Sequence, residues 1–301
     1  MCCREGYIPS HDDPKSDSFL QRGDLMPVKG RLLNYVNGEW QPSSTAEYLD
    51  VTNPATGEII AEVPLSTKTD VDEAVQSAAK AFPGWRRTPA VDRVQHLFKL
   101  KHLLDKHFEE LAALITKDCG KTLAESRGEL RRAIENVEVA CGIPTMMQGY
   151  NSEDVSHGID EFMVRQPLGV VAAVTPFNFP AMIPFWFMPY AIACGNTFLL
   201  KPSEKDPSCS LKLAQLFKEA GLPDGVFNVV NGDKEAVDAL LTNKDVVAIS
   251  FVGSTPIAKY IYENAAKNEK RVQALGGAKN HCVIMPDCDL DQAVNGLMGA
   301  A

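Results

Sequence analysis

The chain has 301 residues, of which 45% are hydrophobic and 23% are charged, as in a globular protein with one large domain or two smaller ones. Its net charge of -9 argues against nucleic acid as a partner, because a phosphate-binding surface needs clustered Lys and Arg. The longest apolar run, residues 179–194, contains three prolines and is shorter than the roughly 20 residues of a membrane span. We therefore expect a core helix there and no membrane association.

Eight cysteines are scattered along the chain without the spacing of a disulfide framework or a zinc site. This scatter predicts reduced thiols, as in the cytoplasm, and no metal ion. The first residues carry four aspartates and no continuous apolar block, which fits neither a secretory signal nor an acid-poor transit peptide. Residues 1–30 are therefore expected to be a disordered leader or an extended start.

A hairpin, a turn and then helices are expected in the first 150 residues. Asn37-Gly38 is a strong hairpin signal, and a second turn is expected at 53–57. The predicted helices run from the T-x-x-D pattern at Thr69–Asp72 to about 83–84, from Thr88-Pro89 onward, and over 123–141, with Gly120 as the cap before the third. Most charges of the third helix are expected to form a solvated face with pairs inside the helix.

From residue 150 onward, strands alternate with helices. Residues 150–166 predict two short strands, and further strands are expected at 169–175, in the apolar segment before Lys201, and at 225–230, 246–251 and 281–285. Helices are expected between them, near 180–194, 206–220, 234–241 and 257–266. This alternation predicts an α/β protein with a parallel, doubly wound sheet, whose ligands bind at the carboxyl ends of the strands.

Two neighbouring strand ends carry polar side chains. Thr175-Pro176-Phe177-Asn178 follows the first, and Lys201-Pro202-Ser203-Glu204 follows the second. An amide, an ammonium and a carboxylate are therefore expected to converge on one edge of the sheet. Residues 201–204, taken alone, are more typical of an ordinary polar loop than of a binding site.

Five motifs, in this order and spacing, resemble the NAD-dependent aldehyde dehydrogenase superfamily: TPFNFP, GNTFLLKPSE, GLPDGVFNVVNG, SFVGST and QALGGAKNH. The resemblance runs from about Leu33 to the last residue, and within the superfamily the chain looks most similar to the CoA-acylating methylmalonate-semialdehyde dehydrogenase branch. It implies a Rossmann-like doubly wound parallel sheet, with an NAD-binding domain over 31–273 and the start of a largely absent catalytic domain over 274–301. It also implies that 150–166 is a hairpin through which subunits form a homo-oligomer, a dimer or a tetramer.

The resemblance also implies which residues bind NAD. A carboxylate at position 204 would accept from the ribose 2′-hydroxyl and repel a 2′-phosphate, which favours NAD over NADP. The helix that follows Ser254 would place free amides and a positive dipole end where a phosphate could lie, although no G-x-G-x-x-G occurs here. The cofactor-binding residues expected in this way are Thr175, Phe177, Lys201, Glu204, Lys205, Ser254 and Gly276.

Two more residues are expected to contact the substrate. Asn178 lies between two phenylalanines, and a buried amide there would donate to the oxyanion that forms when a thiolate adds to an aldehyde. It could also cap the following helix. Arg132 matches an arginine that meets the carboxylate of the substrate in this branch, a role that suits a planar guanidinium.

The chain departs from hydrolytic aldehyde dehydrogenases at Ala274, where those enzymes have a glutamate that activates water. Alanine cannot move a proton, so an acyl-enzyme would have to be released by a co-substrate with its own nucleophile, and the CoA thiol is one. The resemblance then implies oxidation of methylmalonate or malonate semialdehyde to propionyl-CoA or acetyl-CoA, with decarboxylation.

A second departure concerns the nucleophile. The superfamily cysteine lies in a loop beyond the helix that begins near Asp289, and neither Cys282, in the strand expected at 281–285, nor Cys288 matches it. The 301 residues are therefore expected to be an amino-terminal part that lacks the catalytic cysteine and does not turn over. A hydrolytic aldehyde dehydrogenase and a non-catalytic NAD-binding protein stay open as alternatives.

Overall fold

The structure, a computed structural model, describes residues 30–278 and 280–300, so nearly all of the leader expected at 1–30 lies outside the described residues. A seven-stranded sheet forms the centre, in the order β11-β10-β7-β8-β9-β1-β2. Five strands are parallel, namely β7 (Val170–Val174), β8 (Thr197–Lys201), β9 (Phe227–Val229), β10 (Val246–Val252) and β11 (Arg271–Leu275). The hairpin of β1 (Asn34–Val36) and β2 (Glu39–Gln41) adds two antiparallel strands at one edge.

The strand order confirms the doubly wound fold, with β7 at its centre. The chain winds from β7 to β8 and β9 on one side, and then returns to add β10 and β11 on the other. The antiparallel edge makes the sheet mixed, which the prediction of a parallel sheet did not include. The switch point therefore lies between β7 and β10, where the loops after the two strands diverge.

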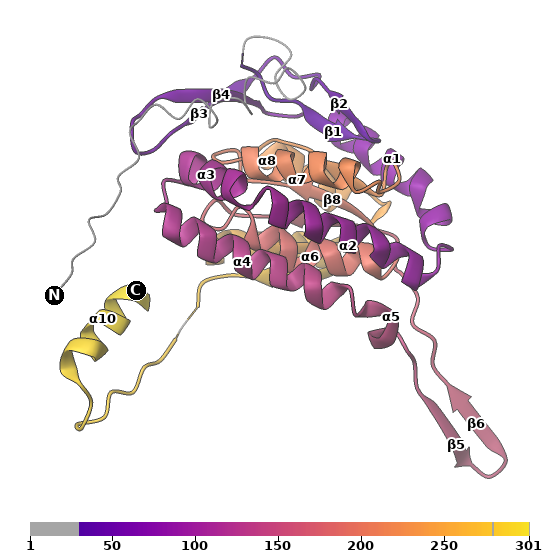
Figure 1. The fold of residues 1–301 in the computed structure, drawn as a ribbon. Helices are drawn as coiled ribbons and strands as arrows, with labels where there is room; N and C mark the ends of the chain where they lie inside the picture. The colour runs from indigo at the N-terminus through magenta and orange to yellow at the C-terminus, as the bar shows by residue number, and fades with distance from the viewer. Residues whose placement is uncertain (1–29, 279, 301) are drawn as a thin grey trace.

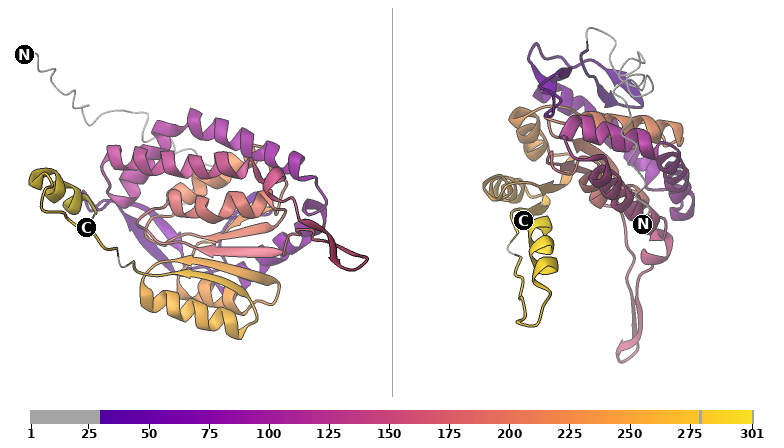
Figure 2. Two further views of the ribbon diagram at one scale, coloured as in Figure 1. Left: turned by 90° about the horizontal axis from the view of Figure 1, so that it is seen from below. Right: turned by 60° about the vertical axis from the view of Figure 1, so that its left-hand side comes forward.

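Helices cover both faces of the sheet (Figures 1 and 2). One layer contains α2 (Ala90–Lys106), α3 (Phe108–Cys119), α4 (Leu123–Ala140), α6 (Met182–Ala193) and α7 (Ser208–Glu219), with the short α5 (Ile143–Met146) beside it. The other contains α1 (Lys68–Trp85), α8 (Lys234–Thr242) and α9 (Thr255–Lys267). Alternate residues of β7 belong to two hydrophobic cores, one on each face of the sheet. Val171 and Ala173 face the first helical layer, and Val170, Ala172 and Val174 face the second.

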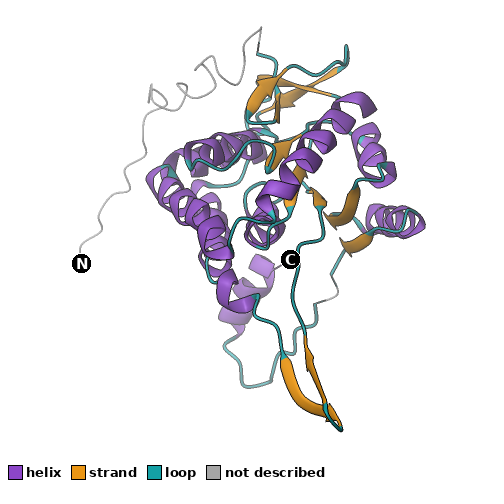
Figure 3. Ribbon diagram, turned by 90° about the vertical axis from the view of Figure 1, so that its right-hand side faces the viewer, coloured by secondary structure: helices purple, strands orange, loops and turns teal. Residues whose placement is uncertain are grey.

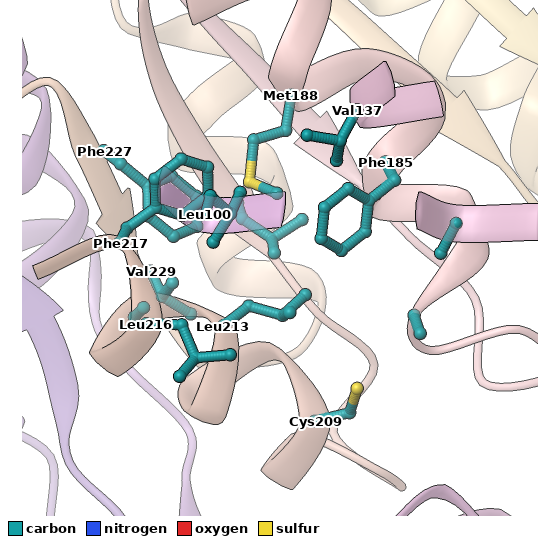
Figure 4. Packing of buried hydrophobic residues seen from close by; sticks show 14 of the residues in the cluster. Leu100, Val137, Phe185, Met188, Cys209, Leu213, Leu216, Phe217, Phe227 and Val229 are labelled. Carbon is teal, nitrogen blue, oxygen red and sulfur yellow. The ribbon is translucent and has the colours of Figure 1, made fainter. Parts of the chain in front are cut away.

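The larger core lies under the first helical layer (Figure 4). Phe217 of α7 packs on Phe227 of β9 with ring centroids 4.9 Å apart, and both side chains are almost fully buried. Val137 of α4 and Phe185 of α6 belong to the same cluster. This packing fixes α4 against α6 and so relates the amino-terminal helices to the loop that precedes α6.

Two helix boundaries differ from the prediction. The capping box of α1 is the T-x-x-D pattern Thr67–Asp70 and not the overlapping pattern Thr69–Asp72 that was predicted. The helix continues through Pro83 to Trp85. Asp70 also accepts hydrogen bonds from Ser43 and Ser44, so contacts from a distant segment select this start. The long helix expected after Pro89 is interrupted at His107, and Gly120, in the left-handed conformation, ends α3.

Two smaller hairpins lie outside the main sheet. β3 (Tyr48–Thr52) pairs with β4 (Ile59–Pro64), and the turn predicted at 53–57 joins them. β5 (Asn151–Ser156) and β6 (Ile159–Phe162) form the hairpin predicted over 150–166, which projects away from the body of the molecule (Figure 3). All its strand residues are exposed, including Phe162 at 81%.

The carboxyl-terminal part departs from the prediction. Residues 281–285 form no strand; they are exposed, with Val283 at 86%. α10 (Leu290–Ala300) follows near the predicted position and lies apart from the sheet (Figure 1). The sheet itself continues to Leu275, the last residue of β11.

Candidate functional site

A cleft of about 570 Å³ lies at the switch point, beyond the carboxyl ends of β7, β8 and β10. Its volume is in the range of small-molecule sites. The predicted residues Thr175, Phe177, Lys201, Glu204 and Ser254 all line it. The other lining residues are Val174, Pro176, Ser203, Asp233, Lys234, Val237, Phe251, Val252, Gly253, Pro256, Ile257 and Tyr260.

The charged pair of the cleft comes from the end of β8. Lys201 Nζ donates to Glu204 Oε2 at 3.1 Å, and the lysine side chain is only 5% exposed against 31% for the glutamate. Burial raises the pKa of Glu204, but the Lys201 charge, hydrogen bonds from Lys201 and the backbone, and Lys205 outweigh it and hold the pKa below its ordinary value. Glu204 is therefore an ionised acceptor at neutral pH.

The end of β7 is tied to the end of β8. The backbone amide of Thr175 donates to the carbonyl of Lys201 at 3.1 Å, so the two loops leave the sheet side by side. Phe177 is half exposed at the cleft, and Lys205 Nζ lies 4.7 Å from the centre of its ring. Lys205 thus contacts a residue of the cleft without lining it.

The first turn of α9 closes the opposite side. Ser254 is the N-cap residue, but its side chain accepts no hydrogen bond from this turn among the described residues. Amides of the first turn and the positive end of the helix dipole therefore lie at the cleft. Gly253 allows the ring of Phe251 to lie against its backbone, because a Cβ there would lie 2.4 Å from Cζ of Phe251.

Three other predicted residues, Gly276, Arg132 and Asn178, lie outside the cleft lining. Gly276 packs against the start of α9, where a Cβ would lie 3.2 Å from Cα of Thr255, while the amide of Gly277 donates to Thr255 Oγ1 at 3.0 Å. Arg132 is exposed on α4, beside Arg131, which makes the expected pairs with Glu135 and Glu138.

Asn178 is exposed, contrary to the prediction of a buried amide. It does not cap α6 either, since Ala181 occupies the N-cap position. Its side chain is accessible beyond the end of β7.

Two buried carboxylates that sequence reasoning missed cap the helices that follow β7 and β8. Glu129 accepts from the amides of Ala181 and Met182 at the start of α6. Asp118 accepts from the amide and hydroxyl of Ser208 at the start of α7. Position 129 could have been found from helical spacing, because it lies on the same face of α4 as the apolar residues 133 and 137.

A further carboxylate, Asp206, is buried between these capping residues and Glu204. Burial, together with the charges of Asp118 and Glu129, raises the pKa of Asp206 to about 9, and burial raises that of Asp118 to about 6. Neither oxygen of Asp206 has a hydrogen-bond partner within the described residues. Asp206 is therefore protonated at neutral pH.

Ala274 lies in β11 opposite Phe251 and carries no group that could activate water. The residues that line the cleft, all within the described ranges, include no cysteine. The six described cysteines are free thiols, and burial raises the thiol pKa of Cys119, Cys141, Cys194 and Cys209.

Within 30–278 and 280–300, no three His, Cys, Asp or Glu side chains are arranged to hold a metal ion, and no helix could cross a membrane.

A doubly wound sheet with a cleft at its switch point defines the class of α/β proteins with the architecture of dinucleotide-binding domains. Residues 40–301 match the model of the aldehyde dehydrogenase family, and the chain belongs to this family.

The chain is also similar to individual proteins that are named as aldehyde-oxidising enzymes. The malonate-semialdehyde dehydrogenase of Pseudomonas aeruginosa is 56% identical over 272 residues, which are 90% of this chain and 54% of the relative. The crystal structure of methylmalonate-semialdehyde dehydrogenase from Oceanimonas doudoroffii matches with a TM-score of 0.88 and 53% identity, over 91% of this chain and 56% of that one. A Sinorhizobium meliloti protein provisionally given the same name, solved with NAD, matches at a TM-score of 0.87 and 47% identity, over 91% and 56% of the two chains. The chain spans about half the length of these relatives.

Proposed function

We propose that the cleft binds NAD and that the whole protein oxidises malonate or methylmalonate semialdehyde to acetyl-CoA or propionyl-CoA, with loss of carbon dioxide. The observation that carries the cofactor proposal is the placement of Lys201 and Glu204 opposite the first turn of α9, across one cleft. When bound, NAD supplies the hydride acceptor. The same cofactor is present in the structure of the Sinorhizobium meliloti relative.

The residues of the cleft fit a dinucleotide. The carboxylate of Glu204 can accept from a ribose hydroxyl, and the ammonium of Lys201, held next to it, can donate to one. The amides at the start of α9 suit a diphosphate, because the side chain of the N-cap residue Ser254 does not accept from them. Phe251, Val237 and Ile257 supply an apolar wall against which a base can pack.

The acylating step of the proposal rests on Ala274. Without a general base at this position, transfer of the acyl group to a thiol is favoured over hydrolysis, since a thiol is a nucleophile in its own right. Arg132 is proposed to recognise the carboxylate of the semialdehyde, supported by the names of the relatives. The exposed β5–β6 hairpin is proposed to join subunits of a homo-oligomer.

Titration of the 301-residue chain with NADH, followed by the fluorescence of the dinucleotide, tests the cofactor proposal. We expect saturable binding that is weakened by Lys201→Ala and unaffected by Lys244→Ala. Absence of saturable binding would contradict the proposal.

Product analysis of the whole protein tests the acylating reaction. With malonate semialdehyde and NAD, acetyl-CoA should form only when CoA is added, and NADH formation should slow strongly without CoA. Release of free acid at the same rate without CoA would instead indicate a hydrolytic enzyme. NADH binding by the 301 residues without turnover is the expected behaviour of this part alone, because no cysteine lines its cleft.

A further inference from the structure

The loop that carries Asn178 is held from outside by three side chains of another part of the fold. Cys119 ends α3, Lys121 lies in the connection, and Glu129 belongs to α4. Each contacts a different residue of segment 177–182, and together they act on both sides of Asn178. We call Cys119, Lys121 and Glu129 the loop support.

Glu129 is the central member of the loop support. Its Oε1 accepts from the amides of Ala181 at 2.9 Å and Met182 at 3.1 Å, which are the N-cap and the first residue of α6. The side chain is 1% exposed, so these amides have no access to water as an alternative partner. Its Oε2 forms an ion pair with Lys121, which compensates the buried negative charge.

Lys121 and Cys119 extend the contact to the two residues that flank Asn178. The ammonium of Lys121 lies 3.8 Å from the centre of the Phe179 ring, a cation–π contact with the residue that follows Asn178. The thiol of Cys119 donates to the carbonyl of Phe177, the residue that precedes it, at 3.4 Å. Phe177 also lines the cleft, so the loop support reaches the cofactor side of the loop.

The Asn178 side chain is exposed, and its position therefore depends on the backbone at either side. That backbone is hydrogen-bonded at Phe177 and Ala181 to side chains of the same short segment of chain, 119–129, and the ring of Phe179 contacts Lys121 of that segment. α4 is in turn fixed against α6 by the core that contains Val137 and Phe185 (Figure 4).

We propose that Glu129, with Lys121 and Cys119, is a positioning residue that sets where the amide of Asn178 lies beyond the end of β7, next to Phe177 of the cleft. This inference rests on the proposed function for the meaning of Asn178, but its geometry stands without it. Glu129 itself touches neither the cleft nor a substrate; it acts through the backbone of 177–182.

Hydrogen exchange of the 301-residue chain, followed by mass spectrometry, tests the loop support. In Glu129→Ala, amides in 177–183 should exchange about tenfold faster or more, because a buried charge-assisted hydrogen bond is lost, while peptides of β10 stay unchanged. Glu129→Gln, which keeps the size and one acceptor, should give a smaller increase at the same amides. The matched control is Glu138→Gln, an exposed glutamate on the same helix. Unchanged exchange of 177–183 in both Glu129 variants would overturn the proposal; should Glu129→Ala unfold the chain, Glu129→Gln alone decides.

The position of Asn178 is measured directly with ¹⁵N-asparagine labelling. Its side-chain amide signals are assigned by their loss in Asn178→Ala, and they should shift in Glu129→Gln and in Cys119→Ala. The buried Asn231, whose side chain donates to Leu33, is the internal control and should not shift. Equal shifts at both asparagines would indicate a general structural effect and contradict a positioning role. NADH titration of the same samples keeps the two proposals apart, since absence of binding by the wild type would count against the cofactor site alone.

Discussion

Lys201 Nζ lies 3.1 Å from Glu204 Oε2, and the lysine is almost completely buried while the glutamate reaches solvent at the cleft. Lys201 orients the carboxylate of Glu204 and stabilises its ionised form. The position of this pair at the end of a central parallel strand places it in the cleft for which we propose dinucleotide binding.

Replacing Glu204 with Gln should change cofactor selectivity. The carboxylate repels a 2′-phosphate, so its loss should lower the ratio of NADH to NADPH affinity by about tenfold, a difference of about 1.4 kcal/mol. Fluorescence titrations with both dinucleotides measure the ratio. Glu263→Gln, an exposed change on α9, serves as control, and a ratio equal to that of the wild type would contradict the proposed role.

Replacing Lys201 with Met should make the cofactor site sensitive to acid. The charge of Lys201 is the main influence that lowers the pKa of Glu204 against the effect of burial. Without it, the pKa of Glu204 should rise, so a larger fraction of the carboxyl becomes protonated as the pH falls toward 5. NADH affinity of the variant should therefore weaken from pH 8 to pH 5 more than that of the wild type. Parallel pH dependence of the two proteins would show that Lys201 does not control this ionisation.

Asp206→Asn should stabilise the protein increasingly as the pH rises. Because burial and the charges of Asp118 and Glu129 raise the pKa of Asp206 to about 9, the folded chain keeps a proton between pH 5 and 8 that the unfolded chain releases. Wild-type stability therefore falls with pH in this window, by at most about 1.4 kcal/mol for each pH unit from this group. Asparagine carries no such proton. Urea denaturation at pH 5 and pH 8 measures the difference between variant and wild type, and a difference that does not change with pH would refute the raised pKa.

Phe217→Ala should lower the free energy of unfolding by about 3–5 kcal/mol, because it removes a fully buried ring and leaves a cavity beside Phe227. Phe98→Ala is the matched control: Phe98 is 54% exposed, and its change should stay within about 0.5 kcal/mol. Denaturation in urea measures both. A small effect at Phe217 would mean that the core under α7 collapses around the gap.

Local signals in the sequence predicted the fold well where the conformation depends on neighbouring residues in the chain. The Asn37-Gly38 turn has the two positive φ angles, 55° and 77°, that its residues favour. The alternation of strands and helices was sufficient to predict the doubly wound sheet and the edge of the sheet at which the cleft lies. The choice between the overlapping patterns at Thr67 and Thr69 was not local, because Ser43 and Ser44 determine it through Asp70.

The site was predicted less completely than the fold. Residues that follow strands, such as Lys201 and Glu204, converge as expected, since topology alone brings them together. Asn178 was wrongly predicted to be buried, because two flanking phenylalanines do not reveal which way a loop turns. Cys282 and its apolar neighbours were wrongly predicted to form a strand, since an apolar run gives no information about whether a pairing strand is present.

The pairing of Tyr35 with Val229 has a consequence for biosynthesis. The β1–β2 hairpin is synthesised well before β9, the strand that it borders, so the sheet cannot close at this edge until β9 has emerged from the ribosome. Until then β1 offers an unpaired edge to other nascent chains. We expect this segment to be a binding site for chaperones during translation.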